Sequence, residues 1–264
     1  MNNLKAVVKQ GVKNGLAYRF DFFVHLLLAP ISLIVYYFLW KSIFGYSGED
    51  VINGFTFTTM ISYYVISLVV GYFTWSEVDE WIEWDVRHGY LIRALIQPIK
   101  YMARSFYFEL GVNLLTIIFQ AIPVMIAAFI FLGLEFVSPL NFILFLVSVA
   151  LASVLYFLIS FMIGLSAFWL NKIDGLIRTK RPLIGFLSGS MIPLTFFPLG
   201  MQAVFDYLPF QYVRFVPIGI YLGMFEVNKI WFYLGMQLAW IIVIYLICEL
   251  IWRQAFKKFS GVGT

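Results

Sequence analysis

Long apolar runs alternate with short polar segments along the whole chain. Six such runs occupy residues 22–44, 54–75, 105–133, 140–169, 182–200 and 229–251. A helix needs roughly 20 apolar residues to cross the hydrocarbon core of a bilayer. The pattern therefore predicts an all-α membrane protein with six transmembrane helices in a single domain over residues 1–264.

The fifth run differs from the others because it contains Pro193 and Pro198 and continues into a Pro- and Gly-interrupted segment, 201–223. The middle of that segment is too polar for a clean span. Backbone that enters a bilayer without crossing it is tolerated only where protein or a watery cavity satisfies its polar groups. We therefore expect 201–223 to form short re-entrant helices that enter the outer leaflet and turn back.

Residues 1–20 show a different periodicity, with a line of lysines beside a line of apolar side chains. These are Lys5, Lys9 and Lys13 on one line, and Leu4, Val8, Val12 and Leu16 on the other. The spacing predicts an amphipathic helix lying on the cytoplasmic leaflet. The alternative is a charged flank that only orients the first span.

Composition and charge support a membrane location. Only 12% of the residues are charged, 62% are hydrophobic and the mean hydropathy is +0.90. All 18 lysines and arginines except Lys41, Arg214 and Lys229 fall on one side of the predicted spans. The positive-inside rule then places both termini in the cytoplasm and the chain in the cell membrane as a multi-pass protein. The net charge of +4 is spread over separated clusters, so we expect no nucleic-acid partner.

Residues that carry chemistry are nearly absent. The single Cys248 excludes a disulfide framework, and no HExxH motif, nucleophile elbow or phosphate loop occurs. The middles of the predicted spans hold essentially no charge, which argues against an ion-coupled carrier or an intramembrane hydrolase. His25 shares a helix face with Asp21 near the start of the first span. His25 is either a structural residue paired with this carboxylate or a ligand or proton carrier. We expect no enzyme activity, metal or cofactor in this chain.

One stretch concentrates charge: WSEVDEWIEWDVRHGYLIRALIQPIKYMAR, residues 75–104. Helical spacing from Val78 to His88, with acids in the early turns and Arg87 in the last, predicts a helix that stops at Gly89. A second, two-turn amphipathic helix then runs to Pro98. We call residues 76–104 the elbow. Its second helix either packs beneath its own bundle or contacts a partner.

Aromatic residues make up 20% of the chain. Most are expected in interfacial belts or in helix packing, and a minority in the wall of a cargo cavity with apolar and cation–π contacts. These aromatic residues include Tyr36, Tyr37, Trp40, Tyr63, Tyr64, Tyr72 and Trp75 in and beside the first two spans.

The segment WDVRHGYLIRALIQPI, followed by FYFELG, resembles the region of ABC-2 type permeases in which the pattern I-R-x-G-x-L-x-x-x-L-x-x-P joins spans two and three. GSMIPLTFFP and YLPFQYVRFVPIGIYLG are similar to the late part of the same family. The resemblance follows the order of all six spans and is to poorly characterised export permeases grouped with daunorubicin- and viologen-type exporters. Gln97 departs from the arginine that many relatives carry.

The resemblance implies a six-span half that dimerises with the same or a homologous permease chain and binds a separate cytoplasmic ABC ATPase, which carries ATP and Mg. It assigns coupling to the elbow residues Arg87, His88, Gly89, Tyr90, Leu91, Arg93 and Ala94. A GxxxG pair with Gly185, Ser188 and Gly189 is a possible dimer-packing site.

The function implied is ATP-driven export of a hydrophobic or amphipathic substrate, drug-like, lipidic or cationic aromatic, by alternating access. An ion-coupled secondary carrier and a non-transporting membrane assembly protein are the alternatives.

Overall fold

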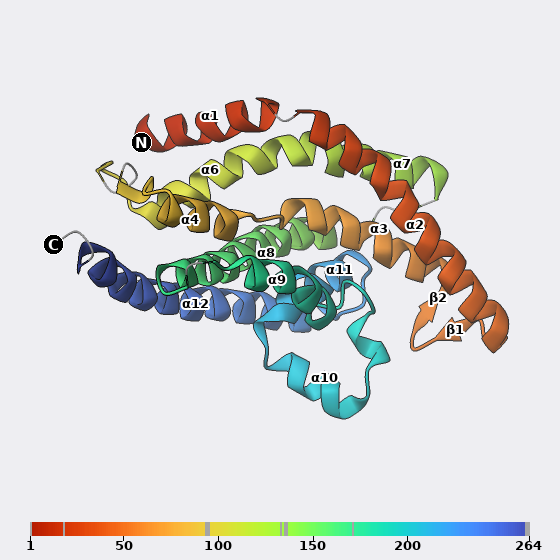
Figure 1. The fold of residues 1–264 in the computed structure, drawn as a ribbon. Helices are drawn as coiled ribbons and strands as arrows, with labels where there is room; N and C mark the ends of the chain where they lie inside the picture. Colours follow the sequence, from red (N-terminus) through yellow and green to blue (C-terminus); the bar gives the residue numbers. More distant parts are fainter. Residues whose placement is uncertain are drawn as a thin grey trace.

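The structure is a computed structural model that describes residues 2–17, 19–92, 96–132, 134, 137–170 and 172–261. Its long helices run side by side, with the elbow and both termini toward the same end (Figure 1). The first elements are α1 (Asn2–Ala17), α2 (Arg19–Ser47), β1 (Val51–Ile52), β2 (Phe55–Thr56), α3 (Phe57–Phe73), α4 (Val78–Arg87), α6 (Tyr101–Thr116), η1 (Ile117–Ala121) and α7 (Ile122–Phe131). The remainder are α8 (Pro139–Leu165), η2 (Ser166–Phe168), α9 (Asp174–Leu187), η3 (Leu194–Phe196), α10 (Leu199–Asp206), η4 (Pro209–Val213), α11 (Phe215–Tyr221) and α12 (Val227–Gly261).

Four helical stretches within the described residues are long and apolar enough to cross a membrane: Phe57–Arg87, Tyr101–Phe131, Pro139–Phe168 and Val227–Lys257. They coincide with the predicted second, third, fourth and sixth spans. The predicted first span lies in the 29-residue helix α2. The side chains of Asp21 and His25 lie outside the described part of the structure. An all-α membrane protein is therefore confirmed.

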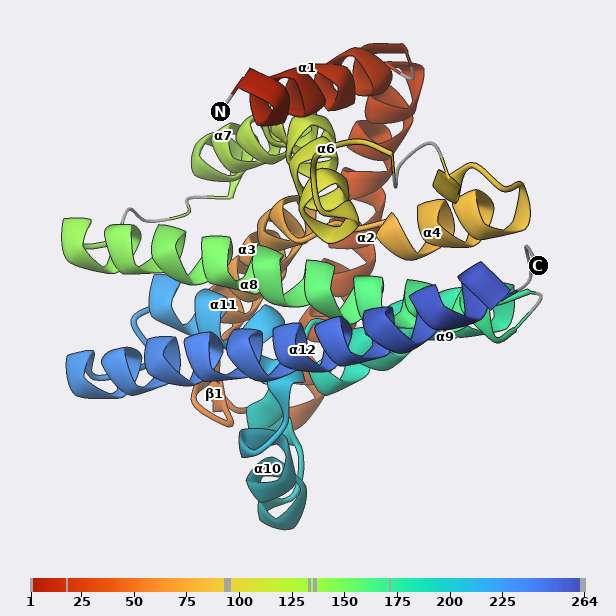
Figure 2. The same ribbon diagram turned by 90° about the vertical axis from the view of Figure 1, so that its left-hand side faces the viewer.

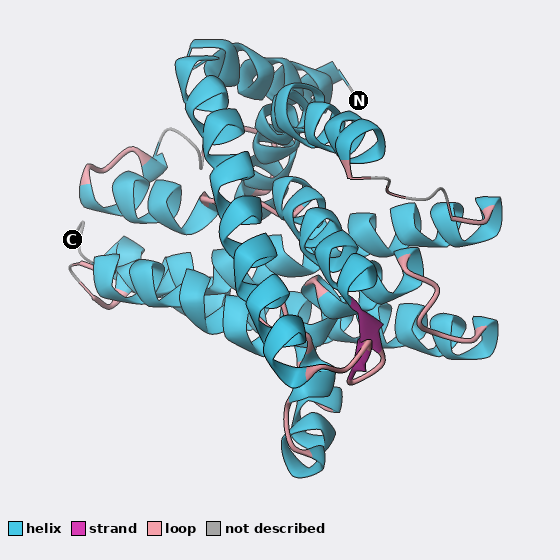
Figure 3. Ribbon diagram, turned by 90° about the vertical axis from the view of Figure 1, so that its right-hand side faces the viewer, coloured by secondary structure: helices cyan, strands magenta, loops and turns pink. Residues whose placement is uncertain are grey.

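A short β-hairpin precedes α3. Its two strands have two residues each, with Val51 opposite Thr56 and Ile52 opposite Phe55. It is the magenta element among cyan helices in Figure 3. Asn53 and Gly54 form its turn with positive φ values of 48° and 83°. The conformation matches the type I′ turn that favours Asn-Gly. The sequence analysis did not predict this hairpin.

The prediction of one helix over 182–200 is wrong. Helix α9 ends at Leu187, and Gly189 follows with a φ of +82°. The amide of Ser190 donates to the carbonyl of Gly185 at 3.1 Å, which closes the helix end. A left-handed glycine satisfies terminal carbonyls in this way, and Pro193 then prevents the helix from resuming at once.

Residues 201–223 form short helices, as predicted, although α10 begins two residues earlier. Helix α10 projects from the bundle, whereas α11 is inserted beside α3 and α8 (Figures 1 and 2). All seven residues of α11 are buried. Their position relative to the outer leaflet stays a prediction.

Helix α1 is present with its three lysines exposed, and it lies along α6. Gly11 and Gly111 meet where these helices cross, and a Cβ atom on either would overlap the backbone of the other helix. The buried line is Val7, Gly11 and Gly15, whereas Leu16 of the predicted apolar line is exposed. Small residues allow this close approach of two backbones. The position of α1 on the cytoplasmic leaflet stays a prediction.

Candidate coupling site

The elbow begins where α3 stops. The hydroxyl and the amide of Thr74 both donate to the carbonyl of Val70, at 2.9 and 3.0 Å, and residues 75–77 run without helix to the start of α4. Helix α4 carries Asp79 and Glu80 in its first turn and Arg87 in its last, an order that complements the helix dipole. Gly89 follows with a φ of +73°, so the predicted helix and its stop are confirmed.

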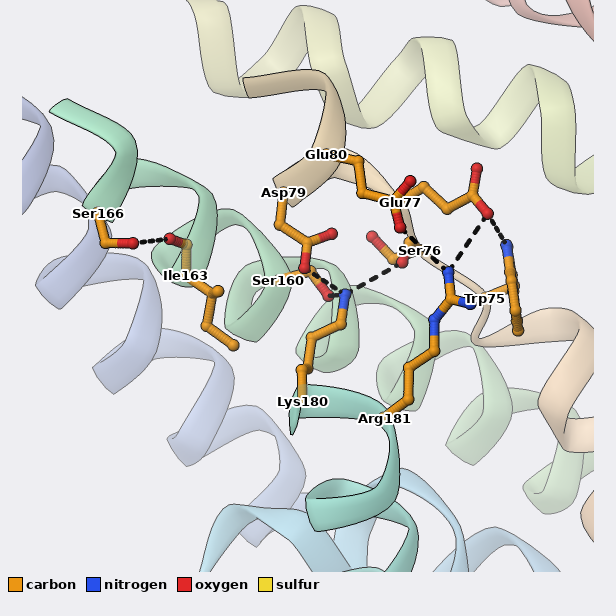
Figure 4. Close-up of polar contacts among 10 residues, drawn as sticks. All are labelled: Trp75, Ser76, Glu77, Asp79, Glu80, Ser160, Ile163, Ser166, Lys180 and Arg181. Carbon is orange, nitrogen blue, oxygen red and sulfur yellow. Dashed lines mark hydrogen bonds and ion pairs between the residues drawn. The ribbon is translucent and has the colours of Figure 1, made fainter. Parts of the chain in front are cut away.

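A fully buried ion pair joins α4 to α9. The Nζ atom of Lys180 lies 2.7 Å from Oδ2 of Asp79, and both side chains are inaccessible to solvent. The same Nζ donates to the hydroxyl of Ser160 on α8 at 3.0 Å and to the carbonyl of Ser76 at 3.3 Å (Figure 4). Three elements and the start of the elbow therefore meet at one ammonium group.

The sequence analysis counted Lys180 only as one of the cytoplasmic positive charges that orient the chain. Its carboxylate partner is about 100 residues away, and no periodic pattern connects the two positions. The sequence of α9 did indicate that Lys180 lies on a buried face, because it is one helical turn from Ile177 and from Ile184, which are both buried. A lysine on a buried helix face requires a partner.

A second, more exposed layer lies beside the buried pair. Nη2 of Arg181 lies 3.4 Å from Oε1 of Glu77 and 3.3 Å from Oε1 of Glu80. The guanidinium carbon lies 4.3 Å from the ring centroid of Trp75, whose Nε1 donates to Oε1 of Glu77 at 3.1 Å. Exposed ion pairs contribute little to stability, so this layer mainly orients Trp75 against α9.

Helix α4 also packs very closely on α8. Val78 and Ile82 are completely buried. A Cβ atom added to Gly164 of α8 would lie 2.7 Å from Cδ1 of Ile82 and 2.9 Å from Cα of Asp79. The missing side chain at position 164 therefore brings α4 within reach of Ser160 and Lys180.

The far end of α4 has its own contacts. Oε1 of the buried Glu83 accepts from Nη1 of Arg87 at 3.3 Å and from the amide of Ile173 at 3.5 Å. The hydroxyl of Tyr101 donates to Oδ2 of Asp85 at 2.8 Å. The Tyr101 ring stacks on Trp252 of α12 with centroids 5.2 Å apart. Helix α4 is thus fixed to the bundle at both ends.

The predicted coupling residues lie at the end of α4 farthest from the buried ion pair. Arg87, His88, Gly89 and Tyr90 are exposed, whereas Leu91 is completely buried. Arg93 and Ala94 lie outside the described residues, as does the middle of the predicted second helix. The structure therefore brings together five of the seven residues, with Leu91 as an anchor.

Exposed aromatic and apolar side chains lie among these five residues and on either side of them in the sequence. The His88 ring stacks on Trp84, with centroids 3.8 Å apart, and Trp84 is 57% exposed. Ile92 and Ile96 are 57% and 79% exposed. We call Trp84, His88, Tyr90, Ile92 and Ile96 the elbow tip. Exposed aromatic and apolar side chains grouped within a short stretch of chain are typical of a protein or membrane contact. Sequence analysis named only two of its members.

The predicted dimer-packing residues do not join the elbow. Ser188 is buried, and the carbonyl of Gly189 accepts a 2.7 Å hydrogen bond from the hydroxyl of Tyr63. Gly185 and Gly189 lie at the capped end of α9 rather than along one continuous helix face. These contacts give both glycines a role within the chain, and their role in a dimer stays a prediction.

Several apolar helices of spanning length, joined to a charged elbow that is fixed to the bundle, define a multi-pass α-helical membrane protein. The model of the family described as "ABC-2 family transporter protein" matches residues 30–263. The chain therefore belongs to the ABC-2 family and is a cell-membrane permease component of an ABC transporter. Such components associate with ABC ATPases and are generally not catalytic themselves. A comparison with curated proteins gives no match.

Proposed function

We propose that this chain is the permease subunit of an ATP-driven exporter that moves a hydrophobic or amphipathic substrate out of the cell. The observation that carries the proposal is the elbow: an exposed tip, suited to a partner, at the end of a helix that a buried ion pair fixes to the bundle. Two such chains, or this chain and a homologous one, with six spans each, would form the pathway. Two cytoplasmic ATPases would supply the ATP, the Mg and the energy.

The contacts of α4 suggest how force would pass. A push on the elbow tip acts on a helix held against α8 at Gly164 and against α9 at Lys180. Separating the buried charges is costly, so α4, α8 and α9 move as one unit rather than sliding past one another. Rocking of such units about the dimer interface would expose the pathway alternately to each side.

The test is to co-express the permease with its partner ABC ATPase and to substitute Trp84 and Tyr90 with alanine. Both side chains are exposed, so we expect normal folding but loss of ATPase co-purification, or of ATP hydrolysis coupled to efflux. Tyr46→Ala is the matched control, because Tyr46 is 96% exposed at the hairpin end of α2. Normal assembly, hydrolysis and efflux in the double variant would exclude this role of the tip.

The same preparation separates the alternatives. Uptake or efflux driven by a proton gradient in vesicles without the ATPase would indicate a secondary carrier. Complex formation that depends on the elbow tip, with no flux of any hydrophobic or amphipathic probe, would indicate an assembly protein.

A further inference from the structure

A positive charge lies inside the bundle at Arg214, between η4 and α11. Its Nη1 donates to the main-chain carbonyl of Ser67 at 2.9 Å. Ser67 lies about 15 Å along α3 from Phe57, at 1.5 Å per residue, which is roughly half the thickness of a hydrocarbon core. The sequence analysis grouped Arg214 with the outer-side cations and did not predict its contact with α3.

The backbone of α3 is shaped to receive the guanidinium. A Cβ atom added to Gly71 would lie 2.7 Å from Nη1 of Arg214 and 3.4 Å from Nη2. Gly71 is one helical turn from Ser67, so the two residues together form a cradle on one face of α3. Any larger side chain at position 71 would displace the charge.

The charge lacks a counter-ion in the part of the chain that the structure describes. No carboxylate there lies within 4.0 Å of the Arg214 guanidinium, and the Ser67 carbonyl is the hydrogen-bond acceptor that it reaches. A guanidinium has five N–H donors, so Arg214 can bind further acceptors in addition to the Ser67 carbonyl. Charges within membrane segments are costly and usually functional.

The guanidinium lines a cavity of about 390 Å³ between α2, α3 and the segment after α9. We call it the tyrosine cavity, because Tyr36, Tyr64 and Tyr72 form much of its wall, with Trp75 at one end. Tyr36 and Tyr64 stack with centroids 3.8 Å apart, and the Tyr64 hydroxyl is fixed by the carbonyl of Met191 at 2.8 Å. The cavity thus combines aromatic and apolar side chains with a cation that has no carboxylate partner among the described residues.

We propose that the tyrosine cavity binds an amphipathic molecule through its anionic group, a carboxylate or a phosphate held by Arg214, with its apolar part against the tyrosines. Guanidinium groups match both anions with paired hydrogen bonds. The cation repels a positively charged cargo, so this inference narrows the proposed export function to anionic amphiphiles at this cavity. The claim that the bound molecule is transported rests on the proposed export function, whereas the claim that it binds in the cavity does not.

The binding test uses the purified permease dimer in nanodiscs of neutral lipid and a pyrene-labelled fatty acid as the probe. Its methyl ester and its trimethylammonium analogue keep the same apolar tail but have neutral and positive head groups. We expect the carboxylate probe to bind more tightly than both. Loss of one charge-assisted contact predicts a weakening of about tenfold or more in Arg214→Gln, with the charge preference abolished.

Three further variants keep the test independent of folding defects. Arg214→Lys retains a cation and should retain the preference for the carboxylate. Gly71→Ala keeps Arg214 but fills its cradle, so carboxylate binding should weaken while ester binding stays unchanged. Lys229→Gln removes an exposed positive charge outside the tyrosine cavity and should leave all three probes unaffected. Equal binding of the three probes to the native protein, or an intact preference in Arg214→Gln, would overturn the proposal.

Two further arms distinguish the source of the anion and separate this inference from the export proposal. ATP-driven movement of the carboxylate probe by the complex with its ATPase, lost in Arg214→Gln, identifies an anionic cargo. Competition by phosphatidylglycerol, with Arg214-dependent binding but no ATP-driven movement, identifies a lipid headgroup site. That second result supports anion binding in the tyrosine cavity and contradicts the export of anionic amphiphiles.

Discussion

Removing Lys180 tests whether the buried ion pair fixes the elbow to the bundle. Lys180→Met keeps the length and much of the volume of the side chain but leaves the Asp79 carboxylate buried without its ammonium partner 2.7 Å away. It also removes the donor to Ser160 and to the carbonyl of Ser76. Breaking a buried pair from one side costs about 3–5 kcal/mol, because the remaining charge must be neutralised or left unpaired.

The measurement is reversible unfolding in mixed micelles, followed by the loss of helical ellipticity. Asp79→Asn should destabilise the protein by a similar amount, since it leaves the Lys180 ammonium buried without a negative partner. The double variant Asp79→Asn/Lys180→Met leaves no buried charge, and its cost should fall short of the sum of the two singles by about 2 kcal/mol. Arg181→Met is the matched control on the next residue. Its ion pairs are partly exposed, so it should cost at most about 1 kcal/mol.

Additive effects, with the double variant equal to the sum within about 0.5 kcal/mol, would refute direct coupling between Asp79 and Lys180. A cost below about 1 kcal/mol for Lys180→Met would likewise show that the pair behaves as an exposed one.

Three glycines give further predictions. Gly164→Val places methyl groups against Ile82, and overpacking of about 1–3 kcal/mol should lower the melting temperature, with Gly235→Val as the control in open space. Gly111→Val should separate α1 from α6 and expose residues after Lys9 to trypsin, whereas an unchanged cleavage pattern would contradict this packing. Gly189→Ala forces a Cβ atom into a left-handed conformation, so unfolding should become easier by about 1–2 kcal/mol; no loss of stability would contradict this requirement for glycine.

Local sequence patterns were sufficient to predict most of the helices. Runs of apolar residues predicted the helices that match four spans, and acids followed by Arg87 and Gly89 predicted α4 and its end. The prediction of one helix over 182–200 failed for a physical reason. Hydropathy does not report backbone conformation, so the apolar run gave no sign that α9 ends at Leu187, before the left-handed Gly189. The six predicted spans also left residues 170–181 between two spans, although these residues include the first half of α9 and the buried Lys180.

The candidate site was predictable only where its residues are neighbours in sequence. The elbow tip is formed by residues within 84–96, and the family resemblance assigned two of its members, His88 and Tyr90, to the coupling element. The pairing of Asp79 with Lys180, and the approach of Arg214 to Gly71, join positions more than 100 residues apart. Such contacts are decided by helix packing, which leaves no local pattern in either segment.

The charges between residues 75 and 104 have two separate roles. Glu77 and Glu80 lie partly exposed around Arg181, whereas Asp79 and Glu83 are buried and hold α4 to the elements beside it. The acids therefore fix the first elbow helix, in addition to keeping it soluble. Trp75 extends this arrangement, because its ring lies against Arg181 and also forms part of the wall of the tyrosine cavity. A molecule in that cavity would contact Trp75, the residue directly before the elbow, so the same side chain contacts both the bound molecule and Arg181 beside the elbow.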